Sequence, residues 1–436
     1  MASPIKNQTN ILEKLSIEKL NPMQKEAQAA ILSNPEIVLL SPTGTGKTLA
    51  FLLPVIAQLD MNCAEVQALI VVPSRELAIQ IEQVIREMGS GFKANAVYGG
   101  RSGSKDKSEI KHRPAILIGT PGRIADHLRR ENFSAELIST LVLDEFDKSL
   151  EIGFEAEMKD ILTLLPNVRK KILTSATYEV KIPPFVDLKK PVLLNYLEQG
   201  NSQLQVKTVL TTSKGKLHTL VGLLSQLGNH PGIVFCNFKD TIQEVSDFLT
   251  DNNISHGCFF GGMEQKDRER VLIKFRNGTH RIIVATDLAS RGLDIPEIKF
   301  IIHFQLPNRN HEFTHRNGRT ARMFNGGTAY VIKGQNEDLP DYIQNAEVEE
   351  IRKATTPSVS LWTTLAISGG RKDKISKGDI AGLFMKQGQL GKDQIGTIEI
   401  KIDCAFVGVH SSEVNRLIPL VDNSRLKSKK VRVTVI

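Results

Sequence analysis

The chain has 436 residues, of which 41% are hydrophobic and 24% charged, so it has the composition of a globular protein and the length of two to four domains. It contains no run of about 18 apolar residues that could span a membrane, no secretory signal at residues 1–10, and four scattered cysteines, so we expect a cytoplasmic protein without disulfides or structural zinc. The net charge of +8 is concentrated at one end: residues 351–436 hold 15 Lys+Arg and 7 Asp+Glu, whereas the remainder holds 41 of each. This predicts a C-terminal module that binds a polyanion.

A phosphate-binding loop is the first motif along the chain. The apolar run Val38–Leu40 leads into SPTGTGKT, and residues 49–59 have the pattern of a helix. Glycines in such a loop let backbone N–H groups approach phosphates, and the helix directs its positive end at them. We predict that Lys47 reaches the β- and γ-phosphates of a nucleotide and that the Thr48 hydroxyl holds Mg²⁺. The predicted nucleotide-binding residues here are Ser41, Pro42, Thr43, Gly44, Thr45, Gly46, Lys47 and Thr48, with Ser41 in the place of the first glycine of the simple pattern.

Strand-like and helical patterns alternate over most of the chain, which predicts parallel sheets with crossover helices. The first series has strands at 66–72, 115–119, 140–143 and 171–173 and helices at 75–88 and 154–165. A polar stretch at 196–206 resembles a linker. The second series has strands at 233–236, 282–285, 300–303 and 329–332 and helices at 241–251 and 266–276, without a second phosphate-binding loop.

Four residues, DEFD, follow the apolar strand that ends at Leu143. Acids at the carboxyl end of a parallel strand face the ligand crevice of such a sheet. Asp144 is therefore predicted to hold Mg²⁺ through water, and Glu145 to polarise the attacking water. An acid-rich helix N-terminus is the alternative for this stretch.

The last 80 residues have a different order of elements. Strands are expected at 359–367, 395–402, 405–409 and 431–436, and helices at 376–386 and 413–419. This β-α-β-β-α-β order is that of small α+β RNA-binding folds.

The chain resembles the DEAD-box RNA helicases of superfamily two, because their motifs occur in the family's order. The matching stretches are Pro73–Ala78 (PSRELA), Gly99-Gly100, Thr120–Arg123 (TPGR), Asp144–Asp147 (DEFD), Ser175–Thr177 (SAT), Ala285–Asp294 (ATDLASRGLD) and His315–Arg322 (HRNGRTAR). Two departures stand out. Phe146 occupies the third position of the DEAD motif, and the upstream Q motif is reduced to Leu20–Gln24, with no aromatic residue before it.

The resemblance implies two RecA-like parallel-sheet domains in tandem, at 1–200 and 207–350, followed by an RRM-like domain at 357–436. ATP and RNA close the two RecA-like domains, hydrolysis reopens them, and RNA strands separate locally. The implied catalytic residues are Lys47, Asp144, Glu145, Arg319 and Arg322, the last two as arginine fingers. Gln24, Gly292 and Asp294 would also bind the nucleotide, and Asp147, Ser175, Thr177 and His315 would couple the two halves.

RNA contacts are implied on both RecA-like domains, at Arg75, Gly100, Thr120, Arg123, Gln265, Arg268, Thr286 and Asp287. Contacts to the RNA backbone would be independent of sequence and sensitive to salt.

The C-terminal region resembles the RNA-binding domain of the bacterial DbpA group, through Ser368–Ile375, Gly378–Ile380 and Ile395–Ile398. That group grips a hairpin of large-subunit ribosomal RNA. Only Phe406 is available to stack on bases in the expected strand 405–409, so we expect binding through basic side chains. The candidates are Arg371, Lys372, Lys374, Lys377, Lys427, Lys429, Lys430 and Arg432; a basic solubility tail is the alternative.

Together these features predict a monomeric, ATP- and Mg²⁺-dependent RNA helicase that remodels ribosomal RNA in large-subunit assembly particles. Two alternatives stay open: an ATP-dependent RNA clamp or annealing protein with little unwinding, and a helicase directed at DNA.

Overall fold

The computed structural model describes residues 7–100, 103–151, 153–177, 182–197, 204–287, 298–320, 326–343, 346–352 and 360–436. The contacts among them divide the chain into two compact units, with the main boundary at residue 202. The predicted site residues Gly292, Asp294 and Arg322 lie outside the described residues. Among the described residues, no helix is long and apolar enough to cross a membrane.

The first unit is built on a seven-stranded parallel sheet with the order β3-β4-β2-β5-β6-β1-β7. Its strands are β1 Glu36–Leu40, β2 Ala68–Val71, β3 Ala94–Val97, β4 Ile116–Gly119, β5 Thr140–Leu143, β6 Lys170–Ser175 and β7 Val192–Asn195. Its helices are α1 Gln8–Lys14, α2 Pro22–Ser33, α3 Lys47–Gln58, α4 Arg75–Met88, α5 Gly103–Ile110, α6 Pro121–Arg129, α7 Phe146–Glu151 and α8 Glu155–Thr163, with the 3-10 turn η2 Pro184–Val186.

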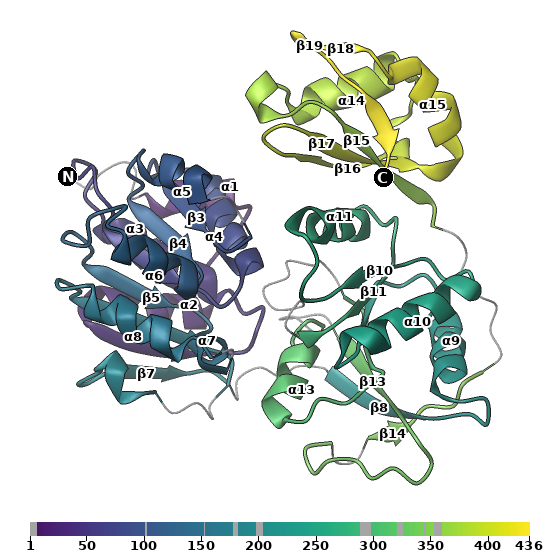
Figure 1. Ribbon diagram of the computed structural model, residues 1–436, viewed down its shortest axis with the longest axis horizontal. Coiled ribbons are helices and arrows are strands. Elements are labelled where there is room, and N and C mark those ends of the chain that lie inside the picture. The colour runs from purple at the N-terminus through teal and green to yellow at the C-terminus, as the bar shows by residue number, and fades with distance from the viewer. Residues whose placement is uncertain are drawn as a thin grey trace. The chain divides into compact units, whose positions relative to one another are not determined.

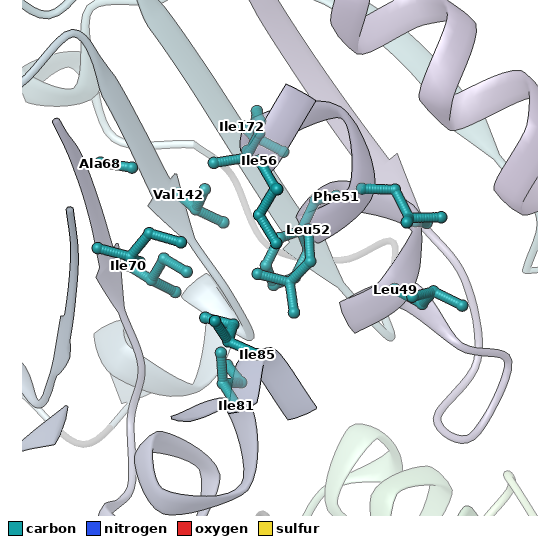
Figure 2. Packing of buried hydrophobic residues seen from close by; sticks show 14 of the residues in the cluster. Leu49, Phe51, Leu52, Ile56, Ala68, Ile70, Ile81, Ile85, Val142 and Ile172 are labelled. Carbon is teal, nitrogen blue, oxygen red and sulfur yellow. The ribbon is translucent and has the colours of Figure 1, made fainter. Parts of the chain in front are cut away.

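Helices cover both faces of this sheet (Figure 1). Along β1, Ile37 and Leu39 pack into one buried cluster and Val38 and Leu40 into the other, as successive strand residues must. Figure 2 shows the first cluster, in which the side chains of α3 and α4 meet those of β2, β5 and β6. Burial on both faces explains why these strands are short continuous apolar runs in the sequence.

The second unit contains another seven-stranded parallel sheet, with the order β10-β11-β9-β12-β13-β8-β14. Its strands are β8 Leu204–Leu210, β9 Gly232–Phe235, β10 His256–Phe259, β11 Ile282–Ala285, β12 Phe300–His303, β13 Gly327–Lys333 and β14 Glu347–Val348. Its described helices are α9 Lys216–Leu227, α10 Lys239–Asp251, α11 Gln265–Arg276 and α13 Asn310–Asn317.

The same unit ends in a four-stranded antiparallel sheet, β16-β17-β15-β20. The elements are β15 Trp362–Ile367, η3 Arg371–Asp373, α14 Lys377–Lys386, η4 Lys392–Gln394, β16 Ile395–Ile400, β17 Ala405–His410, η5 Ser411–Glu413, α15 Val414–Val421, the hairpin β18 Arg425–Leu426 with β19 Lys429–Lys430, and β20 Val433–Val435. Apolar residues of α14 and α15 pack on one face of this sheet. The fold class predicted from the sequence is confirmed.

Some details of the sequence interpretation need correction, among them the following. The polar stretch at 196–206 ends inside β8, which begins at Leu204 and pairs with both β13 and β14. Its half-buried residues mix polar and apolar side chains, which hides the strand. The strands β3 and β10 were not anticipated, because ANAV and HGCF carry too few large apolar residues to stand out.

Candidate functional site

The phosphate-binding loop lies between β1 and α3, where the sequence predicted it. Gly44 and Gly46 have φ angles of 81° and 87°, a left-handed backbone that glycine adopts without strain. Ser41 needs no such freedom: it is buried, and its backbone N–H donates to Ser175 O at 3.0 Å. This explains why the loop tolerates serine in place of its first glycine.

The Lys47 ammonium is held inside the loop. Its Nζ donates to Ser41 O at 2.5 Å and to Pro42 O at 2.8 Å, and the side chain is 8% exposed. Thr45 closes the same turn, since its hydroxyl donates to Pro42 O at 2.8 Å. A cation cradled by backbone carbonyls beside a helix N-terminus suits a polyphosphate, which the Lys47 amine and the N–H groups of the loop can bind together.

Gln24 connects the partial Q motif to this loop. Its amide nitrogen donates to Gly46 O at 3.2 Å, and its amide oxygen accepts from Asn21 N at 3.0 Å. The Asn21 amide donates to Thr45 O at 3.0 Å. The N-terminal cap of α2 is thus hydrogen-bonded to the phosphate loop, and the nucleotide contact of Gln24 stays a prediction.

The two acids that follow β5 are organised by Thr174 of β6, the adjacent strand. The Thr174 hydroxyl donates to the Asp144 carboxylate and accepts from Glu145 N at 3.2 Å. Glu145 has a φ of 49°, so its half-buried side chain leaves the strand direction at a left-handed turn. Burial raises the pKa of Asp144 to about 6, with the Glu145 charge adding to the rise, while the Thr174 hydrogen bond and the Lys47 charge oppose it.

The coupling residues predicted in this unit also come together. The Thr177 hydroxyl donates to Asp147 Oδ2 at 3.1 Å, and the Thr177 N–H donates to Ser175 Oγ at 3.0 Å. The SAT segment is therefore bonded to the DEFD segment across the end of the sheet. Phe146 is 2% exposed and belongs to the apolar cluster that includes residues of α6 and α8. Its side chain therefore packs in the core.

The predicted RNA-binding residues of the first unit follow β2, β3 and β4 at the same edge of the sheet. Arg75 begins α4 after β2, Gly100 follows β3 with a φ of 84°, and Thr120 caps α6 after β4. A side chain added at Gly100 would meet the Arg75 guanidinium, so these two lie together. Because β3, β4 and β2 are neighbours and β5, β6 and β1 continue the order, one sheet edge carries both predicted sites.

Arg123 does not extend freely from α6. Its Nε donates to Asp106 Oδ2 at 2.7 Å, and the buried His127 lies 3.5 Å from the same carboxylate oxygen. An RNA phosphate contact by Arg123 would share the guanidinium with Asp106.

In the second unit the first arginine of HRNGRTAR has a structural position. Arg316 is 1% exposed and forms a two-pronged ion pair with Asp287, at 2.7 Å and 2.5 Å. It also donates to Gln305 O at 2.6 Å and to Asn237 Oδ1 at 2.8 Å. The Asp287 carboxylate is thus engaged within the protein, whereas Thr286, after β11, is half-buried at the sheet edge.

The remaining candidates in the parallel-sheet part of this unit are mostly buried. Arg319 and His315 are each 8% exposed, around the end of α13. Arg268 is also 8% exposed, with its guanidinium carbon 4.8 Å from the centre of the Phe259 ring, and Gln265 begins the same helix, α11.

The candidate RNA-binding residues of the C-terminal domain fall into two groups. Lys427, Lys429 and Arg432 form ion pairs of 3.0 Å with Asp379, Asp373 and Asp422. The others, all exposed, are Arg371, Lys372, Lys374, Lys377 and Lys430. The loop of Arg371 and Lys372 is fixed, because their backbone N–H groups donate to Lys401 O and Ile402 O at 2.9 Å.

Sequence reasoning missed Thr174 and the partners of Arg316. Thr174 precedes the SAT motif and belongs to no motif itself, so only the pairing of β5 with β6 reveals it. Asn237, a polar residue shortly after the apolar strand β9, was an available signal. Gln305, shortly after β12, accepts from Arg316 through its backbone carbonyl, which no pattern of side chains reveals.

Three family models match most of the chain. The DEAD/DEAH box helicase model matches residues 21–183, the helicase conserved C-terminal domain model 215–324, and the DbpA RNA binding domain model 364–435. Among curated proteins, the chain is 31% identical over 448 residues to the ATP-dependent RNA helicase DbpA of Escherichia coli (strain K12), covering 98% of this chain and 96% of that protein. It is 29% identical to DbpA of Bacillus subtilis (strain 168), covering 97% and 96%.

Solved structures agree with the fold. The DEAD-box helicase Mss116 bound to ssRNA and UDP-BeF matches with a TM-score of 0.70 at 25% identity, covering 79% of this chain and 77% of that chain. Dbp5 of S. cerevisiae, bound to RNA and ADP BeF3, matches in fold with a TM-score of 0.68 at 23% identity, covering 80% and 93%.

The phosphate loop, the acids beside it and these full-length matches lead to one conclusion. The chain belongs to the DEAD-box ATP-dependent RNA helicases and is of the DbpA type, with the RNA-binding domain of that type following its two helicase domains.

Proposed function

We propose that this RNA helicase remodels a hairpin-bearing region of large-subunit ribosomal RNA during ribosome assembly in the cytoplasm, and that its C-terminal domain selects the RNA. The supporting observation is the distribution of charge: residues 351–436 carry a net +8, equal to that of the whole chain. The rest of the chain, which includes the helicase domains, has no net charge, and the C-terminal domain is basic. This distribution suits a protein whose helicase domains hydrolyse ATP while the C-terminal domain selects the RNA. We further propose that the protein works as a monomer divided into domains at 1–200, 207–350 and 357–436.

For hydrolysis we propose Lys47 as the phosphate ligand and Glu145 as the residue that orients the attacking water. The burial of Asp144 next to the Lys47 charge, and the hydroxyl of Thr48 at the start of α3, give the mix of carboxylate and hydroxyl oxygens that Mg²⁺ accepts beside a nucleotide. When bound, Mg²⁺ would neutralise charge on the phosphates. Arg319 and Arg322, from the second helicase domain, are the proposed arginine fingers.

The RNA contacts proposed on the helicase domains remain Arg75, Gly100, Thr120, Arg123, Gln265, Arg268, Thr286 and Asp287, with Gly292 and Asp294 beside the nucleotide. The eight RNA contacts would hold the RNA backbone and carry little sequence information. Sequence preference would then reside in the C-terminal domain.

The test is RNA-stimulated ATP hydrolysis in the full chain, measured against the concentration of RNA with and without the ribosomal hairpin. The double variant Lys372→Glu/Lys374→Glu should raise the concentration of hairpin RNA needed for half-maximal stimulation by roughly tenfold or more. The reason is that the C-terminal domain no longer contributes a second RNA contact on the same chain. Rising salt should weaken the wild type more than this variant.

The matched control is Lys386→Glu/Lys392→Glu, which changes two exposed lysines of the same domain that are not among the candidates. It should leave the curve within about twofold of the wild type. If the two double variants need the same concentration of hairpin RNA, the C-terminal domain does not select RNA through Lys372 and Lys374. A role in solubility would then replace the proposal.

A further inference from the structure

The second helicase domain holds an aromatic side chain, Phe238, that is 65% exposed. Among the described residues, it is the only Phe, Tyr or Trp that is neither buried nor half-buried. Single exposed apolar residues are common on protein surfaces. Phe238, however, follows the end of β9 by three residues, so it lies at the carboxyl edge of the parallel sheet, where such domains bind their ligands.

The backbone on both sides of Phe238 is fixed by hydrogen bonds. The Asn237 N–H donates to Gln305 Oε1 at 2.8 Å, and the Asn237 side-chain amide donates to Leu306 O at 2.9 Å. On the other side, the Ile242 N–H donates to Phe238 O at 3.2 Å. A firmly held segment therefore presents the ring to solvent.

Phe238 also occupies a position that a polar residue would fill better. It is the N-cap of α10, where Ser, Thr, Asn and Asp are favoured because their side chains accept hydrogen bonds from the first turn. A phenyl ring cannot do so, and Phe238 makes no side-chain cap hydrogen bond. A residue that departs from a local rule of folding in this way points to a function.

The ring lies beside the predicted RNA contacts of this domain. Arg316 Nη2 donates to Asn237 Oδ1 at 2.8 Å and to Asp287 Oδ2 at 2.5 Å. The residue before Phe238 therefore shares a guanidinium with a predicted RNA contact. Thr286, the other predicted contact there, follows β11, which pairs directly with β9.

A lysine and a second aromatic ring extend this surface towards β10. Lys239 is exposed, and its Nζ lies 5.4 Å from the centre of the Phe260 ring. Phe260 is half-buried and directly follows β10, which pairs with β11. Proteins that bind single-stranded nucleic acids combine aromatic rings, on which bases stack, with cations that attract the phosphates.

We propose that Phe238 is a stacking platform for one base of the RNA strand bound by the second helicase domain, and that Lys239 attracts a neighbouring phosphate. The proposal rests on the proposed RNA contacts Thr286 and Asp287, and it adds a contact to a base beside those to the backbone. Every base has an aromatic face, so the contact accepts any sequence. A base inside a duplex has both faces covered, so the ring favours a strand that has already separated.

The first test is RNA-stimulated ATP hydrolysis of the full chain, measured against the concentration of a single-stranded RNA without the hairpin. Phe238→Ala should raise the concentration needed for half-maximal stimulation roughly tenfold, and Phe238→Trp, which can still stack, should recover most of that loss. The matched control is Val348→Ala, which trims a side chain that is 58% exposed on β14, the strand at the far end of the sheet from β10. It should stay within about twofold of the wild type.

A result for Phe238→Ala within about twofold of the wild type would overturn the proposal. The exposed ring would then be a surface for a protein partner and not for RNA.

Phe238→Thr separates stacking from a structural role. Threonine supplies the cap that α10 lacks, so the midpoint of urea denaturation should stay equal or rise. The concentration of RNA needed for half-maximal stimulation should nevertheless rise as in Phe238→Ala. A lower midpoint would show that the ring supports the fold, and would overturn the proposal.

RNA that lacks a single base tests the stacking directly. One abasic nucleotide is placed at successive positions of a fluorescent oligonucleotide, and its binding is measured by anisotropy with a nonhydrolysable ATP analogue. At one position the missing base should weaken binding to the wild type roughly tenfold and cause no further loss in Phe238→Ala, because the two changes remove the same contact. Equal losses in the two proteins at every position would overturn the proposal.

The proposed backbone contacts can fail separately. Thr286→Val should weaken the binding of intact and abasic RNA alike. If it weakens neither while Phe238→Ala weakens only the intact RNA, the contact proposed for Thr286 is wrong and the stacking stands. The role of the C-terminal domain is tested with the hairpin RNA and does not enter these measurements.

Discussion

The two helicase domains have the same seven-stranded parallel architecture and use its carboxyl edge differently. In the first, the loops after β1, β5 and β6 bring a lysine, two acids and a serine-threonine segment together around a phosphate loop. In the second, the loops after β9, β11 and β12 supply Asn237, Asp287 and Gln305, and all three bind Arg316. The sheet determines where polar groups collect, and the loop residues determine what those groups can do.

The difference also appears in the charged groups. Asp144 keeps a raised pKa of about 6 beside Lys47, which suits a site that binds ions and polyphosphate. Arg316 has its charge compensated by Asp287 and is 1% exposed, which suits a structural cation. We therefore expect substitutions at the carboxyl edge of the first domain to lower the rate of ATP hydrolysis. Substitutions of Arg316 should mainly lower the stability of the second unit.

The largest expected effect is at Glu145. Glu145→Gln keeps the shape of the side chain but removes the charge that would orient the attacking water, so RNA-stimulated hydrolysis should fall about 10³-fold. ATP should still bind, because Lys47 and the loop are unchanged. A fluorescent-nucleotide titration and a phosphate-release assay measure the two quantities, with the exposed Glu155→Gln of α8 as control. Turnover like that of the wild type would remove Glu145 from its proposed role.

Arg316 and Arg319 should separate stability from catalysis. Arg316→Ala leaves the Asp287 carboxylate without its buried partner, and we expect it to destabilise the second unit by about 3–5 kcal/mol. Arg319→Ala should instead lower RNA-stimulated hydrolysis about 10³-fold, as expected for an arginine finger. Denaturation and phosphate release should be measured on both variants. A stability of Arg316→Ala equal to that of the wild type, or full activity of Arg319→Ala, would contradict these roles.

A smaller effect is expected at Thr174. Thr174→Val preserves the shape but removes the hydroxyl that donates to Asp144 and accepts from Glu145 N. Loss of these bonds should lower kcat roughly tenfold and leave the KM for ATP, which depends on the phosphate loop, within about twofold. Thr174→Ser retains the hydroxyl and should recover most of the activity. A rise in KM with kcat unchanged would show that Thr174 supports nucleotide binding instead.

The contrast between the two edges also explains what the sequence could reveal. The phosphate loop and the DEFD acids were predictable because they are contiguous and follow apolar strands. Thr174 was not, because its partners are 29 and 30 residues away and are brought near by pairing of β5 with β6. The contact between the Thr364 and Thr279 hydroxyls, 2.7 Å apart, was hidden for the same reason, because the two residues are separated by 85 residues and neither belongs to a motif.

The smallest effect concerns His303, which lies in the second domain next to Arg316. Its Nε2 is 3.0 Å from Asn317 Oδ1, its Nδ1 is 3.5 Å from Arg316, and its ring stacks on Phe313. Burial, reinforced by the Arg316 charge, lowers the pKa of His303 to about 3. Such a histidine stays neutral in the folded protein at pH values where the unfolded chain is already protonated.

The sign of the pH dependence follows from that difference. Below the ordinary histidine pKa of about 6.5 the unfolded state binds a proton that the folded state does not, so this group makes stability fall as the pH drops from about 6.5 towards 3. Its contribution to the slope approaches about 1.4 kcal/mol per pH unit. His303→Gln removes the titrating group. The free energy of unfolding, measured by amide hydrogen exchange in β9 and β12 at several pH values, should therefore depend less steeply on pH, by up to about 1.4 kcal/mol per pH unit. Carboxylates titrate in both the wild type and the variant, so only the difference between their slopes is informative. Equal slopes would show that His303 is protonated in the folded state and that Arg316 does not hold it neutral.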